Sequence, residues 1–228
     1  APEGVVMNHG ITTTDVAAGV RQANLVVVCT PVERIAEYVA QAGRHCPENC
    51  PITDAGSTKA AWVPQAEAAL APRFGSRLPF VGSHPIAGSE KTGPEAASAD
   101  LFAGRTVVVT ETAASDPAAA DRVESFWQSL GSRVVRMSPS DHDAALAYTS
   151  HLPHLVAAAL AGSTPGKDLD LTGSGWQDTT RVAAGDAELW RQILLTNRAS
   201  TLKALADFER VLAEYRAALE SADGAKLA

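Results

Sequence analysis

A histidine in a glycine-flanked loop is the strongest candidate for proton transfer in this sequence. His84 is followed by Pro85 and lies in the segment GSHPIAGSEKTG, residues 82–93, which comes after a short apolar run. Proline and the flanking glycines favour tight turns, and functional side chains concentrate in loops of this kind. Histidine is the usual general base near neutral pH. A lone histidine is more often structural or solvated, so the surrounding turn residues are what favour a functional role.

Two further polar segments each follow a predicted strand. Residues 53–59, TDAGSTK, contain Asp54 and Ser57 at the start of a predicted helix. These side chains could cap the helix, or the helix start could bind an anionic group. Thr30 and Pro31 end the preceding strand, where ligands bind in open α/β sheets, although a proline-stiffened turn is the favoured explanation for these two residues taken alone. The residues alone leave both pairs of alternatives open.

The second half of the chain offers weaker candidates. Histidines 151 and 154 flank Pro153 and could simply mark a helix junction, while an arginine in a helical region is usually a surface charge. No single residue here carries a functional argument. The polar side chains of interest are Ser150, His154, Asp178, Arg181 and Trp190.

The elements that must position these residues fall into two classes. Up to residue 137, short apolar runs alternate with helical patterns, which predicts an α/β domain with a mainly parallel sheet. After residue 137 the strand patterns stop and helices follow. We therefore expect one domain at residues 1–137 and a helical domain at 138–228. The predicted strands are residues 25–30, 51–54, 80–82, 106–110 and 133–137, and the predicted helices between them are 32–42, 57–70 and 117–130.

The helical half has its own pattern. We expect a helix from Ser138 or Ser140 to about residue 152, another from near Pro153, and a loop at residues 162–175, which are rich in Gly, Ser, Thr and Pro. From residue 202 to 219 large apolar side chains recur every three or four positions and form one stripe. Such a stripe needs a partner surface, so we expect a homodimer built through this half.

Composition excludes some classes of partner. The chain of 228 residues has 19 basic and 26 acidic side chains and a net charge of −7, which argues against binding nucleic acid or an anionic membrane. No apolar run is long enough to span a bilayer. The three cysteines are odd in number, which favours a reducing cytoplasm. Cys46 and Cys50 stand beside His45, but no second ligand pair follows, so we predict no metal site.

Taken together and in order, these segments resemble the prephenate/arogenate dehydrogenase family of tyrosine biosynthesis. The family pattern runs D-x-G-S-x-K, G-x-H-P-[MI]-A-G-x-E-x-S/T-G, L-F, W-x-x-x-G-x-x-V, H-D, S-H-L-P-H, D-x-T-R-[IV]-A, D-x-x-x-W and N-R. Each motif is modestly specific, whereas the ordered set is highly specific and covers most of the chain. The matching residues are 54–59, 82–93, 101–102, 127–134, 142–143, 150–154, 178–183, 186–190 and 197–198.

One departure from the family pattern matters. A domain that binds a nicotinamide dinucleotide should open with a strand, a glycine-rich turn and a helix, and this chain contains no G-x-G-x-x-G segment. The resemblance therefore implies a partial Rossmann-type domain, and we expect the glycine-rich turn upstream of Ala1 in the encoded protein.

The resemblance implies an oxidoreductase that decarboxylates prephenate or arogenate oxidatively, with hydride transfer to NAD or NADP. It implies that His84 draws the proton from the ring hydroxyl and that Ser57 binds this hydroxyl or orients His84. It further implies that Arg181 binds a substrate carboxylate. Assigned in the same way are His154 and Ser150 in the substrate pocket, Glu90, Asp178 and Trp190 near its mouth, and Thr30, Pro31, Asp54 and Ser57 on the cofactor side.

Two other functions stay open. A related β-hydroxyacid dehydrogenase would need a catalytic lysine in the helical half, where Lys167 and Lys203 lie outside any recognisable motif. A non-catalytic dimeric remnant that binds aromatic ligands is the second alternative, and the intact His84, Ser57 and Arg181 argue against it. The motifs separate neither prephenate from arogenate nor NAD from NADP.

Overall fold

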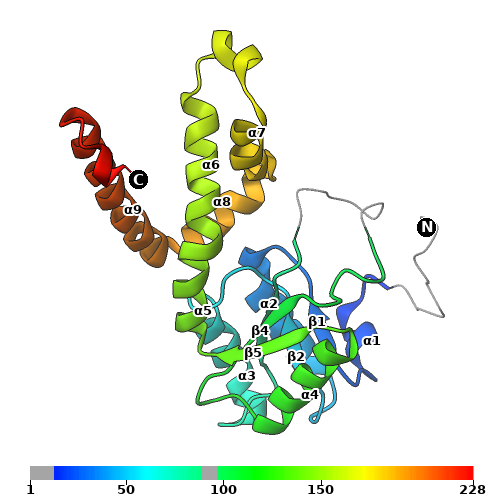
Figure 1. The fold of residues 1–228 in the computed structure, drawn as a ribbon. Coiled ribbons are helices and arrows are strands. Elements are labelled where there is room, and N and C mark those ends of the chain that lie inside the picture. Colours follow the sequence, from blue (N-terminus) through cyan, green and yellow to red (C-terminus); the bar gives the residue numbers. More distant parts are fainter. Residues whose placement is uncertain (1–12, 89–96, 228) are drawn as a thin grey trace. The chain divides into compact units, whose positions relative to one another are not determined.

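The computed structural model describes residues 13–88 and 97–227 (Figure 1). Contacts divide the chain into two compact units, residues 1–143 with 185–196, and residues 144–184 with 197–228. We call them unit 1 and unit 2. A stretch of the second half, residues 185–196, therefore belongs with the first half of the chain.

Unit 1 is built on five short strands that follow the aliphatic runs of the sequence. β1 and β2 are parallel, and a parallel bridge between Ile52 and Phe80 continues the sheet towards β3. β3 and β4 are antiparallel, with His84 opposite Val108, and β4 and β5 are parallel. The expected α/β fold is confirmed, with the antiparallel pair as the exception to a parallel sheet. The strands are β1 (Val26–Val28), β2 (Ile52–Asp54), β3 (Gly82–Pro85), β4 (Thr106–Thr110) and β5 (Arg133–Met137).

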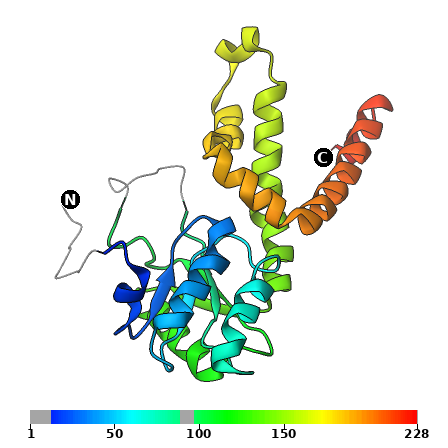
Figure 2. The ribbon, with the colours of Figure 1, turned by 180° about the vertical axis from the view of Figure 1, so that it is seen from behind.

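Helices cover both faces of this sheet, as Figures 1 and 2 show. One apolar core joins β1 and β2 to the helices α2 and α3, and the other joins β4 to α4. Neighbouring residues of β1 point into opposite cores: Val28 lies in the first core and Val27 packs against the second. This strand is therefore covered on both faces. The helices of unit 1 are α1 (Val16–Val20), α2 (Val32–His45), α3 (Val63–Phe74), α4 (Pro117–Ser129), α8 (Ala187–Thr196) and the first five residues of α5 (Pro139–Leu146).

The start of α3 differs from the prediction. We expected a helix from residue 57 with Asp54 or Ser57 as its cap, but the helix begins at Val63 and Trp62 occupies the cap position. Residues 55–62 form turns instead, because the carboxylate of Asp54 is engaged by tertiary contacts described below. The helix start proposed as an anion site is therefore absent from this turn.

Unit 2 is helical; α6 begins within one residue of the predicted start near Pro153, and only the predicted loop was partly wrong. No break separates α5 from the next helix: a π-helical turn η2 (Ala147–His151) leads directly into α6 (Leu152–Ser163). Pro153 cannot donate to a helical hydrogen-bond ladder, and it lies just after the π-helical turn, where the regular α-helical ladder is interrupted. The expected loop at 162–175 contains the 3₁₀ helix η3. The remaining elements are η3 (Gly166–Leu171), α7 (Ser174–Thr180), η4 (Arg181–Ala184), α9 (Arg198–Glu220) and η5 (Gly224–Lys226).

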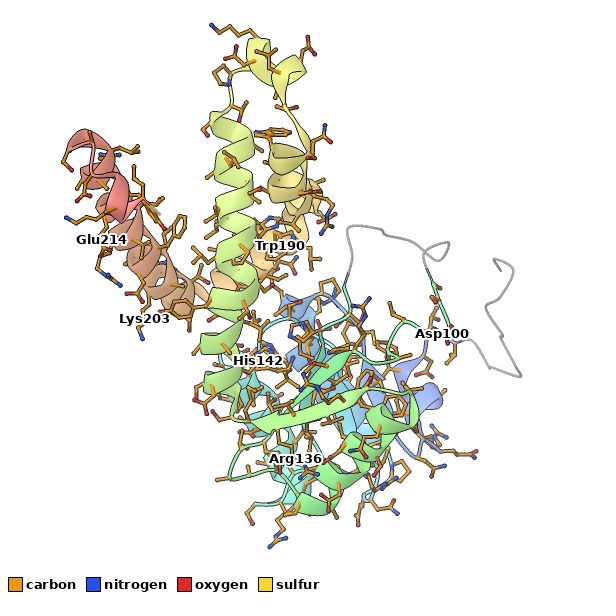
Figure 3. The ribbon with its side chains drawn as sticks, in the orientation of Figure 1. Asp100, Arg136, His142, Trp190, Lys203 and Glu214 are labelled. Carbon is orange, nitrogen blue, oxygen red and sulfur yellow. The ribbon has the colours of Figure 1, made fainter. Side chains whose placement is uncertain are left out.

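Over the described residues, no helix has both the length and the apolar character that crossing a bilayer requires. α9 is the longest helix, and its apolar stripe is largely exposed. Leu212 and Leu219 are 50% and 67% exposed, whereas the residues that α9 buries are the small Thr201, Ala204 and Ala218. Figure 3 labels Lys203 and Glu214 on this helix.

Candidate active site

His84 lies in β3, where the backbone passes close to its neighbours. A Cβ added at Gly82 would lie 2.4 Å from Thr110 Oγ1 and 3.1 Å from the Lys59 side chain, so only glycine fits there. The next residue, Ser83, is fully buried and its hydroxyl accepts a hydrogen bond from Trp127 Nε1 at 3.0 Å. The half-buried His84 is therefore positioned by a strand that the close approach at Gly82 and the hydrogen bond to Ser83 hold in place.

Two further side chains extend His84 into a hydrogen-bonded relay. His84 Nδ1 lies 2.9 Å from His142 Nε2, and His142 Nδ1 lies 2.7 Å from Asp143 Oδ1. The backbone N–H groups of Lys59 and Ala60 donate to the two carboxylate oxygens of Asp143, at 2.9 and 2.8 Å. His142 and Asp143 are buried, and Figure 3 labels His142 in α5, the helix that follows β5.

The relay favours one of the two neutral tautomers of His84. An ionised carboxylate only accepts, so His142 donates its Nδ1–H to Asp143 and its Nε2 accepts from His84 Nδ1–H. His84 Nε2 then carries a lone pair and can take up a proton. Burial is the main cause that lowers the pKa of His142, and the nearby Lys59 charge lowers it further, while Asp143 opposes the shift. A neutral His142 is the form that this arrangement requires.

The turn at residues 54–60 supports the relay and carries Ser57. Asp54 ends β2 and forms a fully buried ion pair with Lys59, with 2.8 Å between Oδ2 and Nζ. Asp54 also accepts from the backbone N–H groups of Gly56 and Ser83. This burial favours a supporting role for Asp54 over direct contact with a cofactor. Ser57, half-buried, lies in the same turn.

The carboxyl end of β1 has features that fit a bound dinucleotide. Within the described residues, Thr30 Oγ1 is buried and has no hydrogen-bond partner. Pro31 follows at the start of α2, and no side chain caps this helix. An orphan hydroxyl beside an uncapped helix start is a suitable partner for a polar or anionic ligand group. Thr30 and Pro31, predicted on the cofactor side, are thus compatible with that role.

In unit 2 the structure brings His154 and Arg181 to neighbouring elements. His154 is buried in α6, and burial lowers its pKa while a hydrogen bond with the Val182 backbone opposes the shift. Arg181 begins η4, the segment that contains Val182, and is exposed. Ser150 lies half-buried in η2 and Asp178 is exposed in α7.

Two other predicted residues are placed differently or not described. Trp190 lies half-buried in α8, which belongs to unit 1 and not to the helical unit. Beside it, Arg191 Nη2 lies 3.2 Å from Glu33 Oε1 of α2, a contact that accompanies the packing of α8 on this helix. Glu90 lies outside the described residues.

Three residues that the structure places in or near the candidate sites had no role assigned to them from the sequence. His142 and Asp143 were noted as an H-D pair without a role, and their adjacency was the available signal. Asn197 was noted only as part of a motif; its Nδ2 lies 3.1 Å from the Nδ1 of the buried His151. His151 is thus an internal packing residue of unit 2, whereas His154 three residues on lies against η4.

Among the described residues, neither the cysteines nor the possible metal ligands form an additional candidate site. Cys46 and Cys50 are buried in the first core, and burial raises the pKa of both thiols, that of Cys50 to about 11. Across residues 13–88 and 97–227, no three histidine, cysteine, aspartate or glutamate side chains gather in a way that could hold a metal ion.

The mainly parallel α/β unit and the helical second unit define a Rossmann-type fold followed by a helical part, and the comparisons identify the family. Residues 3–136 match the nucleotide-binding domain of prephenate dehydrogenase, and residues 138–228 match its dimerization domain. The chain belongs to the prephenate dehydrogenase family, which confirms the resemblance drawn from the motifs.

Individual relatives agree with this assignment. The cyclohexadienyl dehydrogenase of Zymomonas mobilis is 33% identical over 219 residues, covering 93% of this chain and 73% of the relative. The prephenate dehydrogenase of Bacillus subtilis is 33% identical, and the chain spans 57% of its length. The Aquifex aeolicus prephenate dehydrogenase, solved with hydroxyphenyl propionate and NAD+, is 32% identical with a TM-score of 0.82, covering 93% of this chain and 74% of that one. The Synechocystis arogenate dehydrogenase is 29% identical with a TM-score of 0.77, covering 92% and 76%.

Proposed function

We propose that this protein catalyses the oxidative decarboxylation of prephenate or arogenate with a nicotinamide dinucleotide, NAD or NADP. The observation that carries the proposal is the His84–His142–Asp143 relay, because the tautomer that it favours leaves His84 Nε2 as a proton acceptor. A ring hydroxyl that must lose its proton as hydride departs needs such an acceptor. Family membership supplies the substrate class.

The reaction balances around this one proton. As the hydride leaves C4 of the cyclohexadienol, the C4 hydroxyl becomes a carbonyl and its proton passes to His84 Nε2. The bond from the ring to its carboxylate then breaks, CO2 departs, and the electron pair makes the ring aromatic. The oxygen becomes a phenolate that recovers the proton from His84. A bound nicotinamide supplies the hydride acceptor, and Thr30 and Pro31 would help to hold the dinucleotide.

The relay supports this role by electrostatics as well as geometry. When His84 takes the proton it becomes a cation, and its Nδ1–H bond to His142 becomes charge-assisted and stronger. Asp143, held by two backbone amides, accepts from His142 and stabilises the positive charge along the relay. Ser57 would bind the substrate hydroxyl or orient His84.

Further side chains are proposed to bind the substrate. Prephenate and arogenate carry carboxylates, and the chain has a net charge of −7, so a cation must hold these groups against a repulsive background. Arg181 is proposed to bind a carboxylate, because a guanidinium matches it bidentately. His154 and Ser150 would line the pocket, with Glu90, Asp178 and Trp190 near its mouth.

We also propose a homodimer formed through α9 and a cytoplasmic location. The dimerization-domain match and the exposed stripe support the dimer. All three cysteines are free, which suits a reducing compartment. The acidic net charge argues against nucleic acid as a partner. The proposed domain division remains residues 1–137 and 138–228.

The test is formation of reduced cofactor by protein expressed from the complete gene, with prephenate and arogenate each offered with NAD+ and NADP+. We expect turnover with at least one combination and release of CO2 equal to the reduced cofactor. Oxidation of a β-hydroxyacid instead would favour the alternative dehydrogenase. Tight binding of the aromatic product with no turnover would favour a non-catalytic remnant.

A further inference from the structure

The buried Asp54–Lys59 ion pair of unit 1 makes several hydrogen bonds to the surrounding backbone, and stability alone does not explain why it is there. Lys59 Nζ donates to Asp54 Oδ2 at 2.8 Å, to Gly56 O at 2.6 Å and to Thr58 O at 3.3 Å. Three acceptors match the three protons of an ammonium, so the geometry favours the ionised pair, although burial raises the pKa of Asp54 and lowers that of Lys59. An apolar pair of similar volume is often as stable as a buried ion pair. Stability alone therefore does not account for it.

The pair closes the turn that holds the far end of the relay. Asp54 Oδ2 accepts from Gly56 N at 2.7 Å, and Lys59 is bonded back to the same carboxylate. This closure orients the N–H groups of Lys59 and Ala60, which both donate to Asp143. A Cβ on Gly56 would lie 2.4 Å from Ile35 Cδ1, so the turn also sits tightly on α2.

The same carboxylate reaches the near end of the relay. Asp54 Oδ1 accepts from Ser83 N at 3.0 Å, and Ser83 precedes His84 in β3. The Asp54–Lys59 pair thus acts on His84 by two routes, through the backbone of β3 and through Asp143 and His142.

The charge of Lys59 adds to this geometry. The titratable groups that face His142 are Asp143, Lys59, Asp54 and His84. Both carboxylates raise the pKa of His142, whereas burial first and Lys59 second lower it. A neutral His142 is needed to accept the Nδ1–H of His84.

We propose that Lys59 is a positioning residue for the reaction: paired with Asp54, it holds the 54–60 turn so that Asp143 and His142 keep His84 in its Nδ1–H tautomer. The kinetic part of this inference rests on the proposed function, whereas the tautomer is a property of the protein alone.

The experiment combines ¹⁵N NMR of the histidine rings with steady-state kinetics on the same proteins. Asp54→Asn/Lys59→Met replaces the ion pair by a neutral pair, so no unpaired charge is left buried. Asp54→Glu keeps both charges but shifts the carboxylate by one methylene. Arg34→Gln, which breaks the exposed Arg34–Glu37 pair of α2, is the matched control.

In wild type and in Arg34→Gln we expect one Nδ1–H tautomer for both His84 and His142. In the neutral pair we expect mixed tautomers for His84 and a fall in kcat of about tenfold or more, with KM for both substrates within about threefold. If that variant does not fold, Asp54→Glu is judged by the same two readouts.

Three results would overturn the proposal: a folded neutral pair with wild-type tautomers and kcat, a fall in kcat with the His84 tautomer unchanged, or an Nε2–H tautomer for His84 in the wild type. If the tautomers behave as expected but no combination of substrates is turned over, the positioning role of Lys59 stands and the proposed reaction fails.

Discussion

His84 Nδ1 and His142 Nε2 lie 2.9 Å apart, so two imidazole rings from strand β3 and helix α5 share a single proton between them. The rings meet edge to face, with their planes at 67°. Only one of the two facing nitrogens can carry the proton when both rings are neutral. An ionised Asp143 can only accept from His142 Nδ1–H, so the arrangement favours the tautomer in which His84 carries the shared proton.

Replacing the base should remove turnover while leaving binding. His84→Asn keeps a polar side chain but cannot take up the hydroxyl proton, so we expect kcat to fall roughly 100- to 10,000-fold. Substrate affinity, measured by titration without turnover, should change little, because the role of His84 is strongest in the transition state. His45→Asn, at an exposed position of α2, is the control. Near-normal turnover in His84→Asn would show that the base lies elsewhere.

Removing the middle of the relay should have a smaller effect than removing the base. His142→Asn takes away the acceptor of the His84 Nδ1–H bond. Hydrogen bonds to charged groups contribute about 1.5–3 kcal/mol, which corresponds to a fall in kcat of roughly 10- to 100-fold. Steady-state kinetics with melting curves on the same preparation test this, since an equally stable variant with wild-type kcat would remove His142 from the mechanism.

The buried His142 should also make the fold sensitive to acid. Its pKa is lowered in the folded protein from 6.5, mainly by burial, so below about pH 6.5 the unfolded chain binds a proton that the folded chain resists. The contribution of His142 should therefore make the free energy of unfolding fall as pH falls from 7 to 5. At neutral pH, where His142 is unprotonated in both states, this contribution should be fully present. Urea unfolding at several pH values should show a weaker dependence in His142→Gln. An identical dependence in both proteins would contradict the assignment.

Losing the proposed carboxylate ligand should weaken substrate binding. We expect Arg181→Gln to lose roughly 2–5 kcal/mol of binding free energy, seen mainly as a raised KM for the substrate, with cofactor binding unchanged. Arg210→Gln, at an exposed position of α9, is the control. If Arg181 were instead structural, the melting temperature would fall while the KM of the folded enzyme stayed near the wild-type value.

A charge in the apolar stripe of α9 should dissociate the dimer. Leu212 is 50% exposed, so Leu212→Glu costs little in an isolated chain but would bury a carboxylate at an apolar interface. Ala213→Glu adds the same charge on the adjacent polar face, beside Glu209 and Arg216 in the helical repeat. Sedimentation at micromolar concentration should show a monomer only for Leu212→Glu. A monomeric wild type would refute the dimer itself.

Much of the fold could be predicted because the strands are coded by local aliphatic runs. β4 and β5 begin and end at the predicted residues, 106–110 and 133–137. The turn after β2 could not be predicted in the same way. A local pattern of Asp54 and Ser57 before an apolar stretch indicates a helix cap, but Asp54 instead binds Lys59 and Ser83 N, and the latter lies 29 residues away.

The relay was out of reach for a similar reason. His84 and His142 are 58 residues apart. No local spacing in the sequence predicts that strand β3 and helix α5 will bring them together. Trp190 and its helix illustrate the same limit, because α8 has an ordinary amphipathic pattern that does not reveal which core it packs on.

The return of residues 185–196 to unit 1 matters for anyone who divides this protein for engineering. A fragment that ends at Met137 would lack His142, Asp143 and α8 together. The amides of Lys59 and Ala60 would lose their carboxylate acceptor, and Glu33 would lose Arg191. Chimeras between relatives should therefore exchange residues 138–143 and 185–196 along with the strands, so that each graft keeps its own histidine pair and covering helix.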